Sequence, residues 1–142
     1  MTPIRGETPM AKSAASTPTT TGQGLAIERR FSSPDIHPFD EVEWEDRHAL
    51  IGDPEDPAFE QRDVQFPKSW SQNATNIVAQ KYFRGQLGTE QREHSVKQMI
   101  SRVASTIAAW GREGGYFASS DDGDAFEAEL TSILLHLSLI HI

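Results

Sequence analysis

Basic and aromatic side chains between residues 70 and 117 are of the types that could bind a phosphorylated ligand. Arginine offers a planar fork that matches phosphate oxygens, and aromatic rings could stack on a nucleobase. The same residues could instead form surface ion pairs or pack at helix ends, and core packing is the expected role of the rings. The candidates are Lys81, Arg84, Arg102 and Arg112 for phosphate and Trp70, Tyr82, Phe83, Trp110, Tyr116 and Phe117 for stacking.

The histidines do not predict a catalytic or metal site. His37 and His48 lie among acidic residues and could be protonated near neutral pH, but no nucleophile accompanies them. His136 and His141 are five residues apart, whereas two imidazoles on one helical face need an i, i+4 spacing. We therefore assign no catalytic, cofactor-binding or metal-binding residue in this chain.

Negative charge is concentrated between residues 35 and 63. This stretch has eleven Asp and Glu residues against Arg47 and Arg62, so it is more negative than the whole chain, whose net charge is −8. A nucleic-acid binder needs clustered Lys and Arg, so binding of DNA or RNA is not expected. The carboxylates also lack the residue order of a calcium loop, and a solvated charged surface is the favoured interpretation.

The chain has no cysteine. Thiyl radical chemistry and thiol exchange both need sulfur that can be oxidised and reduced, so this polypeptide cannot perform either by itself. Gly22-Gln23-Gly24 lacks a preceding strand and a complete phosphate-binding glycine pattern, and a flexible hinge is the preferred interpretation. The redox chemistry of any larger enzyme would have to come from other parts of the protein.

No segment predicts export or membrane insertion. The longest apolar run is too short to span a bilayer, and the N-terminus has no apolar core followed by a small-residue cleavage site. We expect a cytoplasmic protein, in which the sequon Asn73-Ala74-Thr75 is not glycosylated.

The first half of the chain predicts a disordered arm followed by extended structure. Residues 1–23 are rich in Thr, Ser, Pro and Gly, without periodic apolar residues. Order should begin near Leu25, with the apolar side chains of Leu25, Ile27 and Phe31 as anchors. Between Phe39 and Phe66, alternating apolar residues predict two short extended segments joined by a turn, and Pro54 and Pro57 inside the stretch with Pro38 and Pro67 on either side exclude a long helix.

The second half predicts three helices, since apolar residues recur there at helical spacing. They should run from Ser69 or Ser71 to Phe83, from Thr89 to about Trp110, and from Asp121 or Asp122 towards His136, with stops at Gly85 and Gly114-Gly115. Their apolar stripes are Ala74, Ile77, Val78, Lys81 and Tyr82; Val96, Met99, Val103, Ile107 and Trp110; and Phe126, Leu130, Ile133 and Leu134. The predicted fold is mainly α, and the three helices can cover one another only partly.

Four blocks of sequence occur in a fixed order. They are GLAIERRF (24–31), HPFDEVEWEDR (37–47), FPKSWSQNATNIVAQKYFRG (66–85) and GREGGYF (111–117). Together they resemble the N-terminal region of adenosylcobalamin-dependent, class II ribonucleotide reductases, over about residues 24–136. None of the blocks is a catalytic motif, so the resemblance indicates a family without indicating a site.

The resemblance implies an enzyme that reduces ribonucleotides, expected to be diphosphates, to 2'-deoxyribonucleotides for DNA synthesis. In that family a cysteine thiyl, regenerated by a cysteine pair, works inside a ten-stranded α/β barrel that is absent from this chain, and nucleotide effectors regulate the enzyme. We therefore expect an inactive fragment whose partner is the remainder of the reductase chain. Adenosylcobalamin would bind outside the fragment, and Lys81, Arg84, Arg102 or Arg112 could contact an effector phosphate.

The resemblance also divides the chain into three parts. Residues 1–23 are the disordered arm, 24–136 the N-terminal domain of the reductase, and 137–142 a tail, LSLIHI, that departs from the family and is interpreted as non-native. An independent acidic helical module that binds a protein through its apolar stripes is the alternative. A reading frame that continues beyond codon 136 into a cysteine-bearing barrel would distinguish the reductase from that module.

Overall fold

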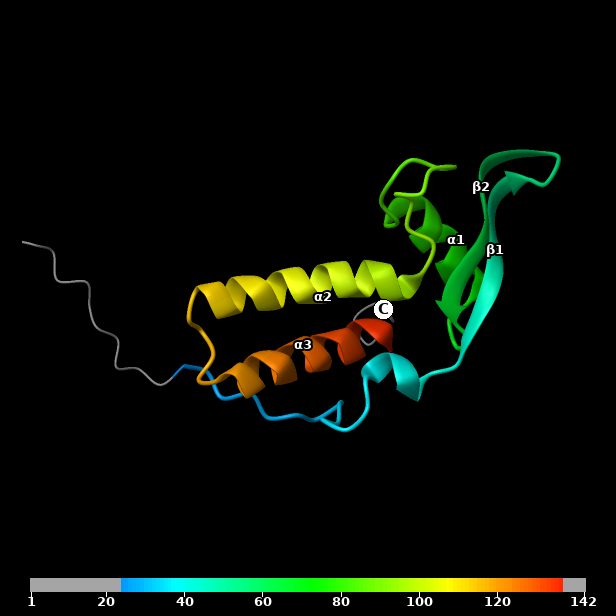
Figure 1. Ribbon diagram of the computed structural model, residues 1–142. Coiled ribbons are helices and arrows are strands. Elements are labelled where there is room, and N and C mark those ends of the chain that lie inside the picture. Colours follow the sequence, from blue (N-terminus) through cyan, green and yellow to red (C-terminus); the bar gives the residue numbers. More distant parts are fainter. Residues whose placement is uncertain (1–23, 137–142) are drawn as a thin grey trace, which may run out of the picture.

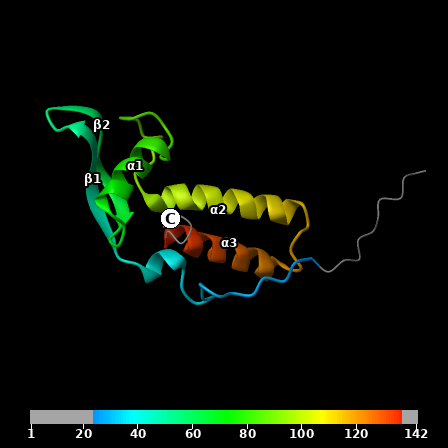
Figure 2. The same ribbon diagram turned by 180° about the vertical axis from the view of Figure 1, so that it is seen from behind.

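A computed structural model of the protein describes residues 24–136, so the predictions for 1–23 and 137–142 concern residues outside the described range. The elements are a 3-10 helix η1 (Pro38–Glu41), strands β1 (Trp44–Asp53) and β2 (Asp56–Pro67), and helices α1 (Gln72–Lys81), α2 (Val96–Glu113) and α3 (Ser120–Leu135). Helices α2 and α3 lie side by side along one half of an elongated molecule, and the hairpin and α1 form the other half (Figures 1 and 2). Three helices and an extended hairpin are thus confirmed. No helix within residues 24–136 has the length and apolar character needed to cross a membrane.

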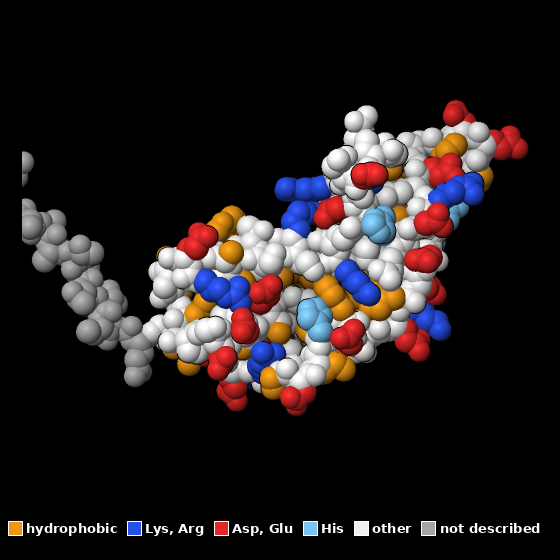
Figure 3. All heavy atoms as spheres, viewed as in Figure 1, with side chains coloured by type: hydrophobic (Ala, Val, Ile, Leu, Met, Phe, Trp, Pro, Cys, Tyr) orange, Lys and Arg blue, Asp and Glu red, His pale blue; other side chains and the backbone are white. Residues whose placement is uncertain are grey.

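Strands β1 and β2 form an antiparallel hairpin. They are 10 and 12 residues long, so the prediction of two short segments was wrong in length. Backbone pairing continues outward past the apolar positions to Asp53 and Asp56, where side-chain alternation gives little signal. Near α1 the hairpin buries Ala49, Val64 and Phe66 in the core. Its distant tip carries exposed acidic side chains, visible at one end of the molecule in Figure 3.

Helix α1 begins where a serine caps it. The Ser71 hydroxyl accepts a hydrogen bond from the Ala74 N–H at 3.0 Å, which confirms Ser71 and excludes Ser69 as the N-cap. The helix ends at Lys81, two residues before the predicted Phe83. Its buried face consists of Thr75, Val78 and Ala79. The predicted stripe was therefore displaced, since Ile77 and Tyr82 are 43% and 60% exposed.

Helix α2 begins at Val96, so the prediction of a start at Thr89 was wrong. A capping box explains the difference: Ser95 and Gln98 satisfy each other's backbone N–H groups, and turns containing Gly85 and Gly88 at positive φ precede them. The buried stripe is Val96, Ile100, Ala104 and Ala108. Two residues of the predicted stripe, Ile107 and Trp110, are exposed instead. Small alanine side chains line the buried face, and a prediction weighted towards large apolar residues overlooked them.

Helix α3 begins at Ser120, one residue before the predicted start, with Ser119 as its N-cap. It packs along α2, and the contact at the far end depends on glycine. A Cβ atom on Gly111 of α2 would lie 2.6 Å from the Phe117 ring, and one on Gly123 of α3 would lie 3.3 Å from it. The Phe117 ring also packs on Phe126, with 5.3 Å between centroids. The two glycines make the space that this ring occupies between the helices.

Residues 24–36 pass along α3 as a strap held by backbone hydrogen bonds. The Ile27 N–H donates to Asp122, and the Glu129 carboxylate accepts from the N–H groups of Phe31 and Ser32 at 3.0 and 2.9 Å. The expected apolar anchoring was wrong for Leu25 and Phe31, whose side chains are 61% and 62% exposed. Polar contacts to the backbone replace the apolar anchors.

We predict that Gly111→Ala destabilises the chain by about 1 to 3 kcal/mol, because the new methyl group must displace the enclosed Phe117 ring. Gly114→Ala is the matched control. Its methyl group would also meet a ring, that of Tyr116 at 2.5 Å, but Tyr116 is 64% exposed and can move aside. Urea denaturation of both variants measures the difference, and equal stabilities would contradict the packing described for Phe117.

We predict that Glu129→Gln loosens the strap, because a neutral amide has one acceptor oxygen in place of the two carboxylate oxygens that now hold Phe31 and Ser32. Amide hydrogen exchange of residues 31 and 32 should become at least about tenfold faster, which corresponds to about 1.4 kcal/mol. The exposed Glu113→Gln is the control and should leave these amides unchanged.

Candidate binding groove

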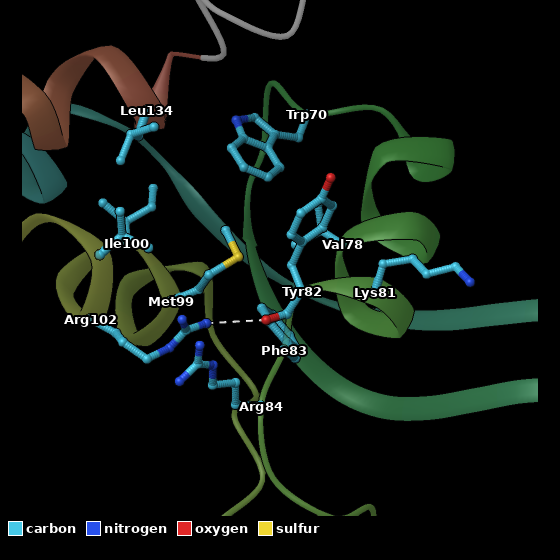
Figure 4. Close-up of a pocket in the computed structure, with 11 residues that line it drawn as sticks. Trp70, Val78, Lys81, Tyr82, Phe83, Arg84, Met99, Ile100, Arg102 and Leu134 are labelled. Carbon is cyan, nitrogen blue, oxygen red and sulfur yellow. Dashed lines mark hydrogen bonds between the residues drawn. The ribbon is translucent and has the colours of Figure 1, made fainter.

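A groove of about 420 Å³ opens where α1, α2 and α3 meet. Its walls come from the C-terminal end of α1, the first half of α2 and the last turn of α3 (Figure 4). Most of the lining is apolar, and three basic residues contribute to the rim. The principal apolar residues are Trp70, Val78, Met99, Ile100, Val103 and Leu134.

Trp70 is the fixed aromatic residue of the groove. Its ring is 4% exposed, and its indole N–H donates to the Leu135 carbonyl at 2.8 Å, which ties the end of α3 to the residues that precede α1. Phe66 packs against both Trp70 and Phe83, with centroid separations of 5.8 and 5.6 Å. Tyr82, in contrast, is 60% exposed, although its ring lies beside Trp70 in Figure 4. Trp70 is therefore held in place, whereas the Tyr82 side chain is accessible to a ligand.

Glu93 organises the basic side of the groove. Arg102 donates to both of its carboxylate oxygens, at 3.0 and 3.2 Å, and the backbone N–H of Arg84 donates to Oε1 at 2.8 Å. Burial acts to raise the pKa of Glu93, but the hydrogen bonds and positive charges of Arg102 and Arg84 outweigh it and the net shift is downward. Arg102 also donates to the Tyr82 carbonyl at 3.1 Å. The carboxylate thus joins α2 to the residues that follow α1.

The side chains of Lys81 and Arg84 have no carboxylate partner within residues 24–136. Arg84 lies beside Arg102 in Figure 4, whereas Lys81 points along the outer side of α1. Within the described residues Arg84 therefore adds an unpaired positive charge beside Arg102, whose own charge is balanced by Glu93. The rim of the groove is therefore basic, although the chain as a whole is acidic.

The structure brings together three of the four predicted phosphate candidates and three of the six aromatic ones. Arg112 lies elsewhere and pairs with Asp124 and Glu127 at 2.8 and 3.1 Å. Core packing is confirmed for Trp70 and Phe83. It was wrong for Tyr82, Trp110 and Tyr116, which are 60%, 64% and 64% exposed. Arg84 and Arg102 lie side by side because the turns after α1 return the chain to α2, whereas Lys81 points away from them (Figure 4). Periodicity alone does not reveal this arrangement.

The histidines occupy structural positions. His37 caps η1 by accepting from the Phe39 N–H at 3.1 Å, and His48 lies 2.8 Å from Glu60. His136 is the exposed C-cap of α3. His141, whose spacing from His136 was considered in the sequence, lies outside the described range. Among residues 24–136 no three His, Asp or Glu side chains form a group that could hold a metal ion.

Glu93 and Arg92 are the important residues that the sequence did not indicate. Arg92 donates to the carbonyls of Ala79 and Phe83 and fixes the end of α1, next to the groove. Neither residue belongs to an apolar stripe or a motif, and both lie in what the sequence predicted to be helix. The groove could therefore bind a ligand that combines an apolar surface with a negative charge. It offers no nucleophile paired with a base.

The family of class II vitamin B12-dependent ribonucleotide reductases has a sequence model that matches residues 52–137, a range that contains every residue of the groove. The chain belongs to this family. The vitamin B12-dependent ribonucleotide reductase of Streptomyces coelicolor is 48% identical over 128 residues, which are 89% of this chain and 13% of the relative. The reductase of Rhodopirellula baltica is 46% identical over 116 residues, and that of Agrobacterium fabrum is 29% identical over 144.

The chain thus spans about one eighth of the length of these reductases, for example 13% and 12% of the two from Streptomyces coelicolor and Streptomyces avermitilis. The match corresponds to an N-terminal region of the family. The predicted resemblance is confirmed by this comparison.

We predict that Glu93→Gln destabilises the chain by about 1 to 3 kcal/mol at pH 7, because Arg102 loses its charged acceptor. The pKa of Glu93 is lower in the folded chain, so its stabilising contribution is complete above the usual value of 4.5 and declines as the pH falls through the lowered value. Denaturation from pH 7 to pH 3 should show the difference between parent and variant shrinking at the acid end. A difference that stays constant would contradict the assigned role.

Proposed function

We propose that the chain is the N-terminal part of a vitamin B12-dependent ribonucleotide reductase, an oxidoreductase that supplies 2'-deoxyribonucleotides for DNA synthesis in the cytoplasm. The observation that carries this proposal is the family match over residues 52–137, together with 48% identity to the Streptomyces coelicolor enzyme. Reduction of ribonucleoside diphosphates by thiyl radical chemistry, regulated by nucleotide effectors, is the activity that we assign to the full-length protein.

The residues described do not fit adenosylcobalamin. The groove, at about 420 Å³, has the size of a site for a drug-sized ligand, and a corrin with its attached nucleotide is considerably larger. The histidines at 37, 48, 94 and 136 do not line it. We therefore place the cofactor in the remainder of the reductase, together with the catalytic cysteines and the ten-stranded barrel.

Residues 24–136 then act as a folded N-terminal domain whose partner is the rest of the same chain. The hydrogen bond between Trp70 and the Leu135 carbonyl supports this role, because it fixes the direction in which the polypeptide leaves the domain. The partly exposed apolar groove supports it as well, since an open apolar surface in a small domain marks an interaction site. Substrate and effector would bind to the complete enzyme.

We predict that the chain alone produces no deoxyribonucleotide when supplied with adenosylcobalamin, a dithiol reductant and ribonucleotides, because it contains no cysteine. The full-length reductase should be active and should require adenosylcobalamin. Parallel assays with ribonucleoside diphosphates and triphosphates measure the preferred substrate. Turnover by the chain alone after removal of host reductase, or full-length turnover without adenosylcobalamin, would refute the proposed function.

A further inference from the structure

The groove combines an apolar floor with a basic edge, and both features indicate what could occupy it. Val78 and Ile100 are buried at its base, while Met99, Val103 and Leu134 are only partly covered. These side chains come from three different helices, so they form one continuous apolar surface only in the folded chain (Figure 4). A surface of this kind accepts the apolar face of an amphipathic helix, with contacts at i, i+3 or i+4 and i+7.

Charge restricts the occupant further. The chain carries a net charge of −8, yet the groove edge is basic, with Arg84 exposed and without a carboxylate partner among the described residues. Arg102 beside it is held by Glu93 at 3.0 Å. An occupant with Asp or Glu flanking its apolar face would pair with Arg84, whereas a basic segment would be repelled.

The position of the groove identifies the source of the occupant. Leu134 is part of the wall, the Leu135 carbonyl accepts from Trp70, and the described residues end at His136. The Streptomyces coelicolor enzyme is about seven times as long as this chain, since the 128 matched residues are 13% of it. Polypeptide that follows residue 136 in such an enzyme starts at the wall of the groove, and attachment gives it a high effective concentration there.

We propose that the groove between α1, α2 and α3 is the docking site of an acidic amphipathic helix that belongs to the same reductase chain, in the part of the enzyme that follows the N-terminal domain (residues 24–136). This inference rests on the proposed function, because it requires the remainder of the reductase. The apolar face of that helix covers Met99, Val103 and Leu134, and a carboxylate of the helix pairs with Arg84. The groove thereby fixes the N-terminal domain against the rest of the enzyme.

Photo-crosslinking in the full-length reductase tests the proposal. Benzoylphenylalanine replaces Tyr82 at the groove or, as a control, Tyr116 at the far end of α2; the two positions are similarly exposed, at 60% and 64%. The Tyr82 probe should capture, within the same chain, a peptide from the part of the reductase that follows the N-terminal domain, with helically spaced apolar residues and flanking Asp or Glu. The Tyr116 probe should not capture that peptide.

A charge exchange tests the assigned pairing. Arg84→Glu should lower the crosslinking yield at Tyr82 about tenfold, and replacement of the captured carboxylate by Lys should restore the yield. The Arg84 side chain is exposed, and the hydrogen bond to Glu93 comes from its backbone N–H. Because the Arg84 charge also favours the Glu93 carboxylate, Arg84→Gln, which adds no like charge beside Glu93, should lower the yield as well. Arg62→Glu, on the hairpin and 74% exposed, is the charge-matched control and should leave the yield unchanged.

Several results would overturn the docking proposal: capture of a second copy, of another protein or of residues 1–23, no capture, or a yield that Arg84→Glu does not alter. Cofactor-dependent turnover of the unmodified enzyme separates this proposal from the function. Normal turnover without capture rejects the groove and retains the reductase. Capture in an enzyme that cannot reduce ribonucleotides retains the groove and rejects the proposed activity.

Discussion

Arginine contacts with backbone carbonyls at both ends of α1 are the constraint on which the shape of this domain depends. Arg47, whose side chain is 10% exposed, donates to the Trp70 carbonyl at 2.6 Å and to the Thr75 hydroxyl at 2.8 Å. Arg92 donates to the Ala79 and Phe83 carbonyls at 2.5 and 2.9 Å. A helix of ten residues has little stability of its own, so its orientation is set by such contacts.

The two arginines act on different ends of the helix for a physical reason. The last carbonyls of a helix have no partner within it and carry partial negative charge, so the guanidinium of Arg92 satisfies them directly. Arg47 reaches α1 from β1 and joins the hairpin to the turn before the helix. Together they place Val78 and Phe83 over the start of α2. The groove exists because this orientation is fixed.

Carboxylates in this acidic chain have structural roles beyond solvation. Glu93 accepts the backbone N–H of Arg84 across the turns after α1, and Glu129 accepts those of Phe31 and Ser32 from the distant strap. In both carboxylates the hydrogen bonds lower the pKa although burial acts to raise it. The acidic hairpin tip is different, because its side chains are exposed and make no long-range hydrogen bond to another residue between 24 and 136. Charge density in the sequence therefore did not identify the carboxylates that hold the fold together. The hydrogen bonds that Glu93 and Glu129 accept in the folded chain identified them.

The sequence alone determined the family, the number of α-helices, the hairpin and a serine cap at Ser69 or Ser71, because these follow from local chemistry and from residue order. It did not determine which helix faces are buried. Ile107 and Trp110 continue an apolar stripe and yet are exposed, while Ala104 and Ala108 are buried, since close approach of α3 requires small side chains. It also could not place Lys81, Arg84 and Arg102 at one groove, because that meeting depends on turns fixed by Gly85, Arg92 and Glu93. Local patterns encode the elements, whereas contacts between residues distant in sequence decide which surfaces meet.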